Sequence, residues 1–304
     1  MGIFTKKENQ LKITNLNDEQ IKNQALYAGL FDKSESKRLS KLTFKSSKRT
    51  FLLDFKGDVY ASSVKKLAKE ISFILTNAKK DDEVIIMIES PGGTVTGYGL
   101  VAEQLDRLRN ANIKITAVVD QVAASGGYLV AAVADKIIAA KRAVIGSIGV
   151  VVGMPNYSEV LNKIGVNYSF YTAGEKKRGV TPFKVPTEAQ VKDLEEELKD
   201  IHDQFKNHIL NYRPDIDMSI VATGETWTGL KALELGLIDE LGISDDLIMS
   251  HIKLNRLVLK IEYNEIKRKK GFLSLSVSSI TEDLIETISN KLVNHIQNIT
   301  IKKY

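Results

Sequence analysis

Short apolar runs alternate with segments of helical spacing through the first half of the chain. The runs 51–55, 84–88 and 115–119 are rich in β-branched or aromatic residues. Their length and continuity are typical of strands that are buried on both faces. Segments 61–77 and 96–110 instead repeat apolar residues every three or four positions, as a helix with one buried face does. Strands that alternate with helices predict an α/β fold with a mostly parallel sheet and flanking helices.

The pattern continues with smaller elements. Residues 126–134 are small and apolar, which favours a tightly packed helix, and residues 187–211 form a charged helix with one apolar stripe that ends before Pro214. Short strands are expected at 135–139 and 143–146. A helix-and-turn unit is expected at 222–241, and a further strand at 257–263.

Composition divides the chain into three parts. Residues 1–49 form a polar, basic extension, in which 17–31 has helical spacing and the rest is expected to be loosely ordered. The main domain covers 50–252. Residues 253–304 form a basic and amphipathic extension. Its apolar stripe is expected to dock on the domain or on another subunit, and a membrane-surface helix is the alternative.

Charge and composition narrow the possible chemistry. The chain has no cysteine, which excludes disulfides, thiol catalysis and cysteine metal sites. Its net charge is +5, and residues 1–50 hold eleven Lys and Arg against five Asp and Glu. A solvated arm is the plain interpretation of this excess, and a segment facing anionic lipid is the other. The sequence shows no signal-peptide core and no apolar run of the about 18 residues that a membrane-spanning helix needs.

The strongest candidate for chemistry is Ser125. It follows a predicted strand and precedes the small-residue helix, so its hydroxyl would sit where helical N–H groups also point. Gly126 and Gly127 permit close backbone approach. Ala123 breaks the G-x-S-x-G pattern, so an α/β-hydrolase is a weak interpretation. Taken alone, a Ser-Gly-Gly sequence is more often only a turn.

A second glycine turn, Ser90–Pro91–Gly92–Gly93, closes another strand of the same sheet. Its freed N–H groups could form part of an oxyanion hole, with the Gly126 N–H as the other donor. Such donors are worth ~3 kcal/mol each in acyl transfer. A glycine turn after a strand is also a common structural device. The spacing does not match a nucleotide-binding loop.

A serine nucleophile needs a base. None of the four histidines lies in a glycine-rich or strand-end context, which argues against a Ser-His-Asp triad and against a histidine metal site. They are His202, His208, His251 and His295. A desolvated lysine can act as the base. Lys176, Lys177 and Arg178 are adjacent, and the pattern alone does not select one of them.

Four segments together resemble peptidase family S49, the signal peptide peptidase A group. They are 89–93 (ESPGG), 122–128 (VAASGGY), 145–150 (IGSIGV) and 172–178 (TAGEKKR), with further likeness at 221–225 and 236–240. The resemblance covers roughly residues 51–250, and segment 13–17 is similar to the N-terminal extension of one branch of the family. It implies a ClpP/crotonase-like fold and a Ser–Lys dyad.

The resemblance assigns a role to each site residue. Ser125 falls on the nucleophile, Lys177 on the general base and Ser147 on a serine that orients the lysine. Lys176 is the competitor for the base. The oxyanion N–H groups would come from Gly92 or Gly93, and from Gly126. The resemblance implies neither a metal nor a cofactor.

The same resemblance implies a serine endopeptidase acting on signal-type or membrane-associated peptides. Homo-oligomers with active sites shared between subunits are expected, with peripheral membrane contact and no nucleic-acid partner. The expected location is the bacterial inner membrane, although this chain shows no anchor of the kind that its branch usually carries; the cytoplasm is the alternative. A non-catalytic membrane-surface scaffold and a crotonase-type acyl-CoA enzyme are the competing functions.

Overall fold

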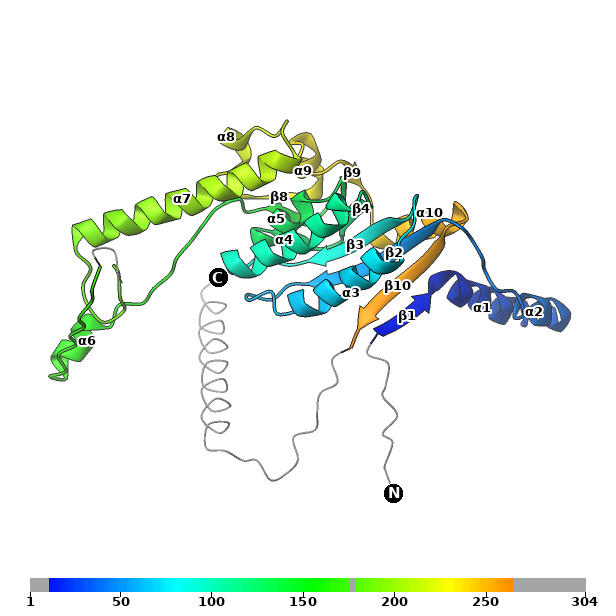
Figure 1. The fold of residues 1–304 in the computed structure, drawn as a ribbon, viewed down its shortest axis with the longest axis horizontal. Helices are drawn as coiled ribbons and strands as arrows, with labels where there is room; N and C mark the ends of the chain where they lie inside the picture. Colours follow the sequence, from blue (N-terminus) through cyan, green and yellow to red (C-terminus); the bar gives the residue numbers. More distant parts are fainter. Residues whose placement is uncertain (1–10, 175–178, 265–304) are drawn as a thin grey trace, which may run out of the picture. The chain divides into compact units, whose positions relative to one another are not determined.

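A seven-stranded sheet forms the centre of the structure, with the strands in the order β1-β10-β2-β3-β4-β6-β9 (Figure 1). The computed structural model describes residues 11–174 and 179–264. All neighbouring strands of this sheet are parallel except the antiparallel pair β1 and β10. The strands are β1 (Leu11–Asn15), β10 (Leu257–Tyr263), β2 (Arg49–Lys56), β3 (Glu83–Glu89), β4 (Lys114–Val119), β6 (Lys136–Ala139) and β9 (Glu240–Leu241). The α/β class with a mostly parallel sheet is therefore confirmed.

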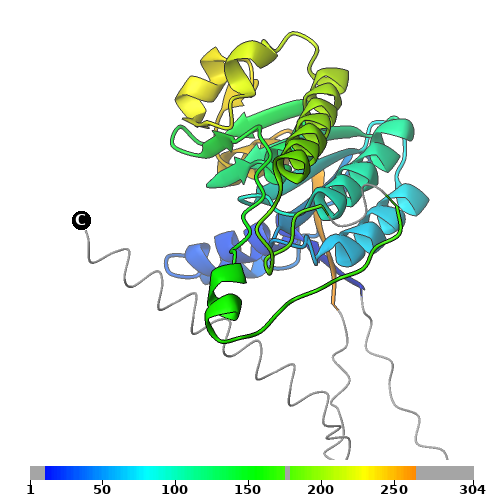
Figure 2. The ribbon, with the colours of Figure 1, turned by 90° about the vertical axis from the view of Figure 1, so that its left-hand side faces the viewer.

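Helices cover the two faces of this sheet unequally. One face carries the larger core, and Figure 2 shows α3 and α4 together on that side. The helices of this layer are α3 (Val64–Asn77), α4 (Val95–Asn110), α5 (Gly126–Ala132), α7 (Glu188–Tyr212) and α9 (Gly229–Glu234). The other face carries a smaller core, against which α10 (Ser244–Lys253) and the first residue of α1 pack.

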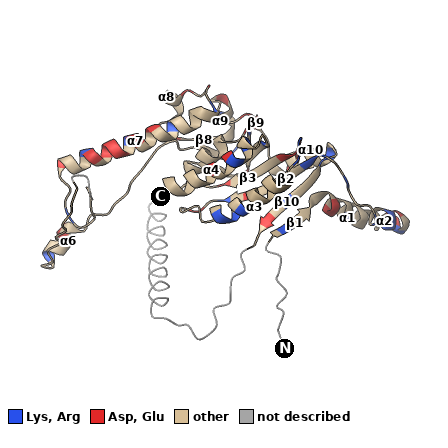
Figure 3. Ribbon diagram, in the orientation of Figure 1, with Lys and Arg blue, Asp and Glu red and all other residues tan. Residues whose placement is uncertain are grey.

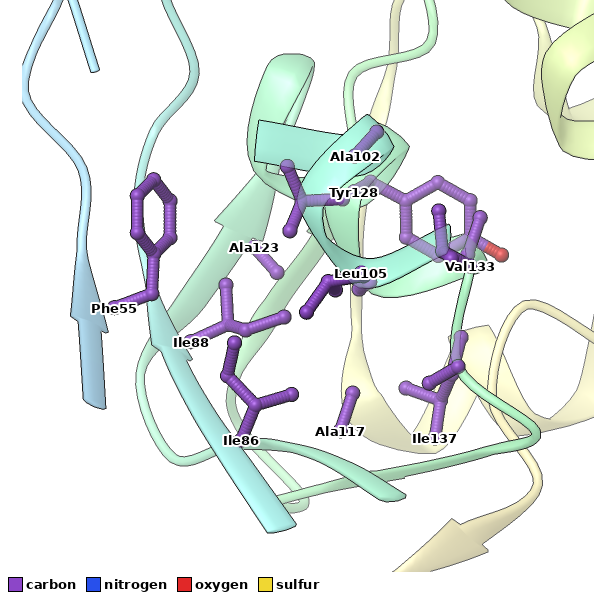
Figure 4. Close-up of a cluster of buried hydrophobic side chains, with 14 of the residues drawn as sticks. Phe55, Ile86, Ile88, Ala102, Leu105, Ala117, Ala123, Tyr128, Val133 and Ile137 are labelled. Atoms are coloured by element: carbon purple, nitrogen blue, oxygen red, sulfur yellow. The ribbon is translucent and has the colours of Figure 1, made fainter. Parts of the chain in front are cut away.

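Alternation along each central strand decides which core a side chain enters. In β3, Ile86 and Ile88 belong to the larger core, whereas Ile85 belongs to the smaller one. Figure 4 shows Ile86 and Ile88 beside Leu105 of α4 and Tyr128 of α5. Both faces of the strand are therefore buried, which explains why its sequence is a continuous apolar run rather than an alternating one.

A second, three-stranded sheet branches from the end of β3. Its strands, in the order β5-β7-β8, are β5 (Val122–Ala124), β7 (Val144–Gly146) and β8 (Thr226–Thr228). Ser90, the residue after β3, bridges to β5: its N–H donates to the Val122 carbonyl at 2.9 Å, and its own carbonyl accepts from Ala124 at 3.0 Å. This small sheet carries the segments that precede Ser125 and Ser147.

The described part of the N-terminal extension is more regular than expected. β1 pairs with β10, and a helical hairpin follows, formed by α1 (Leu16–Ala28) and α2 (Lys33–Leu39). Outside 17–31 we expect loose order until the segment docks; β1 is docked on β10, and α2 is a helix that this expectation does not include. Asn15 and Asp32 cap the two helices by accepting N–H bonds at their N-termini. Residues 265–304, including the amphipathic segment, lie outside the described residues.

Two short helices complete the fold. α6 (Ser158–Lys163) lies in the long connection between β7 and α7, and α8 (Met218–Val221) follows α7. In Figure 1 the α6 segment extends away from the central sheet. Within residues 11–174 and 179–264, no helix is both long enough and apolar enough to cross a bilayer.

Candidate active site

Ser125 sits at the junction of β5 and α5 with an unusual backbone conformation. Its φ and ψ are 50° and −122°, a region that residues with a Cβ rarely adopt. Its N–H donates a 2.7 Å hydrogen bond to the Gly146 carbonyl, which holds the turn against β7. The side chain is half-buried. The strand therefore turns abruptly into the helix and presents this serine at the bend.

Ser147 occupies the equivalent place after the neighbouring strand. β5 and β7 run parallel with Ala124 paired to Gly146, so Ser125 and Ser147 follow adjacent strand ends. Ser147 also has a positive φ, 53°, and its N–H donates to the Glu225 carbonyl at 2.6 Å. The two serines line the same cavities. Their proximity thus comes from the register of the small sheet.

The Gly92 backbone lies directly against the Ser125 turn. Gly92 has a φ of +96°, and a Cβ placed on it would lie 2.7 Å from the Ser125 Cβ and 2.8 Å from the Gly126 nitrogen. Only glycine permits this approach. The Gly92 N–H itself donates to Ser90 Oγ at 3.1 Å. Among the described residues, no acceptor engages the N–H groups of Gly93 or Gly126.

A buried hydroxyl network holds this glycine turn. Ser90 is fully buried, and its Oγ hydrogen-bonds to the Tyr98 hydroxyl as well as accepting from Gly92. Tyr98 in turn donates to the Asp58 carbonyl at 2.8 Å. Burial raises the pKa of Tyr98, so the phenol stays neutral and remains a donor. The network fixes the turn after β3 relative to α4.

A cleft of about 780 Å³ opens in front of these residues. Its walls combine the glycine turn, the two serines, one side of α4 and α7, and residues 149–152. Most of the lining is apolar, and its apolar side chains include Val59, Leu129, Leu198, Ile201 and Phe205. Tyr98, Glu103, Asp106 and His208 are the ionisable side chains among its described lining residues. The glycine turn and the two serines thus open into a mostly apolar cleft.

A second cavity of about 490 Å³ is lined by both serines and by residues of α7. Lys199 and His202 line it, and sequence patterns had not connected either residue with Ser125. The His202 Nε2 lies 3.2 Å from the Ile148 carbonyl oxygen, so that nitrogen carries a proton and donates to the carbonyl. The apolar stripe of α7 does not reveal that Lys199 and His202 lie beside Ser125, because their position depends on the path of the whole helix.

His208 also reaches the cleft wall. Its Nε2 lies 3.0 Å from the Leu129 carbonyl, and burial lowers the pKa of its ring below the ordinary value. His208 is therefore a neutral, anchored side chain. Neither ring nitrogen has a carboxylate within hydrogen-bonding distance among the described residues, as a Ser-His-Asp arrangement would require.

The lysine candidates fall outside this description. Lys176 and Lys177 lie in the undescribed segment 175–178, while the residues just before it, through Gly174, are exposed. Within the described part of the chain, no group of three or more His, Asp or Glu side chains could hold a metal ion.

Two family models match this chain. "Peptidase family S49" matches residues 107–257, and "Peptidase family S49 N-terminal" matches residues 3–105. The first match contains the Ser125 turn, the small sheet and α7, and the second contains the hairpin, β2, β3 and the glycine turn. The two matches thus meet in α4, which forms one wall of the cleft.

Individual relatives agree with these models. The chain is 46% identical over 243 residues to "Probable protease SohB" of Buchnera aphidicola subsp. Acyrthosiphon pisum, covering 80% of this chain and 71% of that protein. It is 48% identical over 213 residues to the protein of the same name from Haemophilus influenzae, covering 70% and 60%. A "Putative signal peptide peptidase SppA" from Enterococcus faecium is 33% identical over 192 residues, covering 60% and 56%.

The α/β fold, with its mostly parallel central sheet and flanking helices, is of the ClpP/crotonase-like type. The chain belongs to peptidase family S49.

Proposed function

We propose that this protein is a serine endopeptidase in which Ser125 is the nucleophile and Lys177 the general base. The observation that carries the proposal is the strained turn at Ser125, which faces a cleft beside free glycine N–H groups. Protease names among the relatives support the same reaction class. Ser147 is assigned the role of orienting the lysine, because it follows the strand paired with that of Ser125.

The proposed reaction runs through an acyl-enzyme. Neutral Lys177 takes the proton of the Ser125 hydroxyl as Oγ bonds to the scissile carbonyl carbon. The C–N bond then breaks, and the lysine ammonium gives its proton to the leaving amine. A water molecule attacks the resulting ester while Lys177 takes its proton. Cleavage of the ester returns that proton to Ser125 Oγ and releases the acid.

The oxyanion is assigned to the N–H groups of Gly93 and Gly126. Gly92, the third candidate, already donates to Ser90 Oγ. Its role in this proposal is therefore steric, since its missing Cβ lets the turn approach Ser125. The expected N–H pair lies on two separate elements, the turn after β3 and the start of α5. The backbone bridge between Ser90 and β5 joins the two.

The proposed substrates are peptides that bind in extended form with apolar side chains, including signal-type and membrane-associated peptides. The apolar walls of the cleft support this class. We also propose a homo-oligomer with shared sites at a bacterial membrane. Side chains such as Val151 and Tyr171, which are 90% and 96% exposed in the single chain, support contact with another subunit.

Labelling by a fluorophosphonate probe tests the dyad. At pH 8 the wild type should be labelled, and Ser125→Ala and Lys177→Ala should each lose labelling with oligomer size unchanged. Lys199→Ala is the matched control, because Lys199 is a lysine that lines the same cavity as Ser125. Labelling that disappears in Lys199→Ala or Lys176→Ala, and survives in Lys177→Ala, would contradict the assigned base.

Subunit mixing tests whether sites are shared. Ser125→Ala and Lys177→Ala subunits, dissociated and reassembled together, should regain part of the wild-type peptidase activity if the serine and the lysine of one site come from different chains. Each variant alone should be inactive. Any regained activity therefore comes from sites that combine the intact serine of one subunit with the intact lysine of another. An absence of regained activity in mixed oligomers of normal size would place both residues in one subunit.

A further inference from the structure

The tip of the α1–α2 hairpin exposes a compact group of large apolar side chains. Leu26, Tyr27, Leu30 and Phe31 are 74%, 66%, 74% and 78% exposed. The rings of Tyr27 and Phe31 lie 5.3 Å apart, and Leu26 and Leu30 are their neighbours in the chain; these four residues are called here the hairpin tip. The position is remote from the cleft in the chain and in Figure 1.

These side chains are not needed to build the hairpin. Ala25 is the buried apolar residue of α1, and Gly29 lets the two helices approach, since a Cβ there would lie 3.1 Å from Ser36 Oγ. The base is fixed to the sheet by Asn17, which is 1% exposed and bonds to the Arg256 carbonyl and the Val258 N–H. The hairpin is thus a well-anchored projection whose apolar end has no partner among the described residues.

Basic residues surround the hairpin tip. Residues 30–48 contain six Lys and Arg against two Asp and Glu. Figure 3 shows the basic side of α2. Arg38 pairs with Glu35, but Lys33, Lys37 and Lys41 are exposed and make no ion pair with a described residue. A surface that fits this region must therefore be apolar at its centre and negatively charged around it.

We propose that the hairpin tip docks on the surface of an anionic lipid bilayer. Leucine and aromatic side chains enter the boundary between headgroups and acyl chains, while nearby lysines face anionic headgroups. Each such lysine adds ~1 kcal/mol near an anionic surface. A second copy fits less well, because it would bring the same positive charges together. Four side chains are also far fewer than the about 20 residues a side of a stable interface.

Vesicle flotation with the full chain tests this proposal. The wild type should bind vesicles containing about a third phosphatidylglycerol and not pure phosphatidylcholine vesicles. Leu26→Ser with Leu30→Ser should lower the affinity at least tenfold, because burying one leucine is worth ~1.5–3 kcal/mol. The matched control is Ile220→Ser with Leu230→Ser, two apolar residues of α8 and α9 that are 49% and 50% exposed. That variant should bind like the wild type.

A fluorescence measurement locates the contact directly. The chain has one tryptophan, Trp227, which lies in β8 of the small sheet with its side chain near Gly146. In Phe31→Trp, brominated phosphatidylglycerol vesicles should quench the added tryptophan, and the wild type should show no such quenching.

Three results would overturn the proposal. The first is unchanged vesicle binding in the Leu26/Leu30 variant together with an unquenched Phe31→Trp protein. The second is a change of oligomer size in that variant, which would make the tip a subunit contact. The third is equal loss of binding in the α8/α9 control.

Discussion

The Ser125 N–H donates a 2.7 Å hydrogen bond to the carbonyl oxygen of Gly146, the residue just before Ser147. This bond continues the ladder between β5 and β7 for one step beyond the last strand pair. It therefore ties the conformation of one serine to the strand that positions the other. Ser125 and Ser147 both have a positive φ, which is a strained backbone conformation for a residue with a Cβ.

Backbone strain at Ser125 should be measurable as stability. Glycine adopts a positive φ without the cost of a Cβ, so Ser125→Gly should be more stable to urea than Ser125→Ala by about 1–2 kcal/mol. Both variants lack the hydroxyl, so the comparison isolates the backbone. Equal midpoints and slopes for the two variants would show that the Ser125 turn carries no strain.

Two glycines that line the cleft should respond to alanine in opposite directions. A Cβ on Gly126 would lie 2.4 Å from Tyr98 Cγ, whereas a Cβ on Gly99 meets nothing within 4 Å. Gly126→Ala should therefore lower the free energy of unfolding by about 1–3 kcal/mol and abolish probe labelling. Gly99→Ala should raise it by about 1 kcal/mol, because alanine favours the interior of α4. Thermal or urea unfolding of both variants measures the difference, and a stable Gly126→Ala protein would contradict the packing described.

The Ser90–Tyr98 network allows a paired test of the glycine turn. Ser90→Ala removes the acceptor of the Gly92 N–H, and leaving a buried donor unsatisfied costs about 1–3 kcal/mol. Tyr98→Phe removes only the phenolic hydroxyl and leaves Ser90 Oγ in place as the acceptor. Ser90→Ala should thus slow probe labelling of Ser125 more than Tyr98→Phe does at equal stability loss. The reverse order would mean that the phenol, rather than Ser90 Oγ, holds the turn.

A buried histidine should make stability depend on pH. His251 is buried, and its Nδ1 lies 2.9 Å from Thr50 Oγ1, which also accepts from Arg256 Nε at 2.8 Å. When Nδ1 is unprotonated, the Thr50 hydroxyl can donate its hydrogen to it. Burial lowers the pKa of His251 below its ordinary 6.5; the positive charges of Arg256 and Lys114 act in the same direction, and Glu83 acts against them.

The sign of this effect follows from linkage. Below about pH 6.5 the unfolded chain binds a proton on this histidine that the folded chain resists, so stability falls as the pH falls. The wild type should lose more unfolding free energy between pH 7.5 and 5.5 than His251→Gln, whose side chain does not titrate. Parallel pH profiles for the two proteins would contradict the assignment.

Local patterns predicted the elements whose own sequence carries a clear apolar run or an apolar stripe. The strands at 84–88, 115–119 and 257–263 and the helix at 96–110 are present as β3, β4, β10 and α4. The strand-to-helix turn at Ser125 was also expected from sequence and is present between β5 and α5. Its role as nucleophile came from the family resemblance and stays a prediction. The ClpP/crotonase-like α/β class followed from the alternation and the family resemblance together.

Other features depend on contacts that a local pattern does not contain. β5 and β8 have three residues each, too few for a periodic signal. The pairing of Ser147 with Ser125 arises from register between two such strands, and serine carries no preference for a positive φ that would reveal it. Placement of Lys199 and His202 beside Ser125 depends on the path of α7. For the hairpin, the sequence predicted a helix over 17–31 and a charge excess, but not α2 or the pairing of the two helices.

The place of β10 in the sheet sets an order for folding during synthesis. β10 lies between β1 and β2, so the strand from the far end of the described chain joins two strands made at its beginning. Until about 200 further residues have been translated, β1 has no neighbour and one edge of β2 stays open. Such long-range closure slows folding and exposes a strand edge to other chains. A nascent chain stalled before Leu257 is therefore the form of this protein most prone to aggregate.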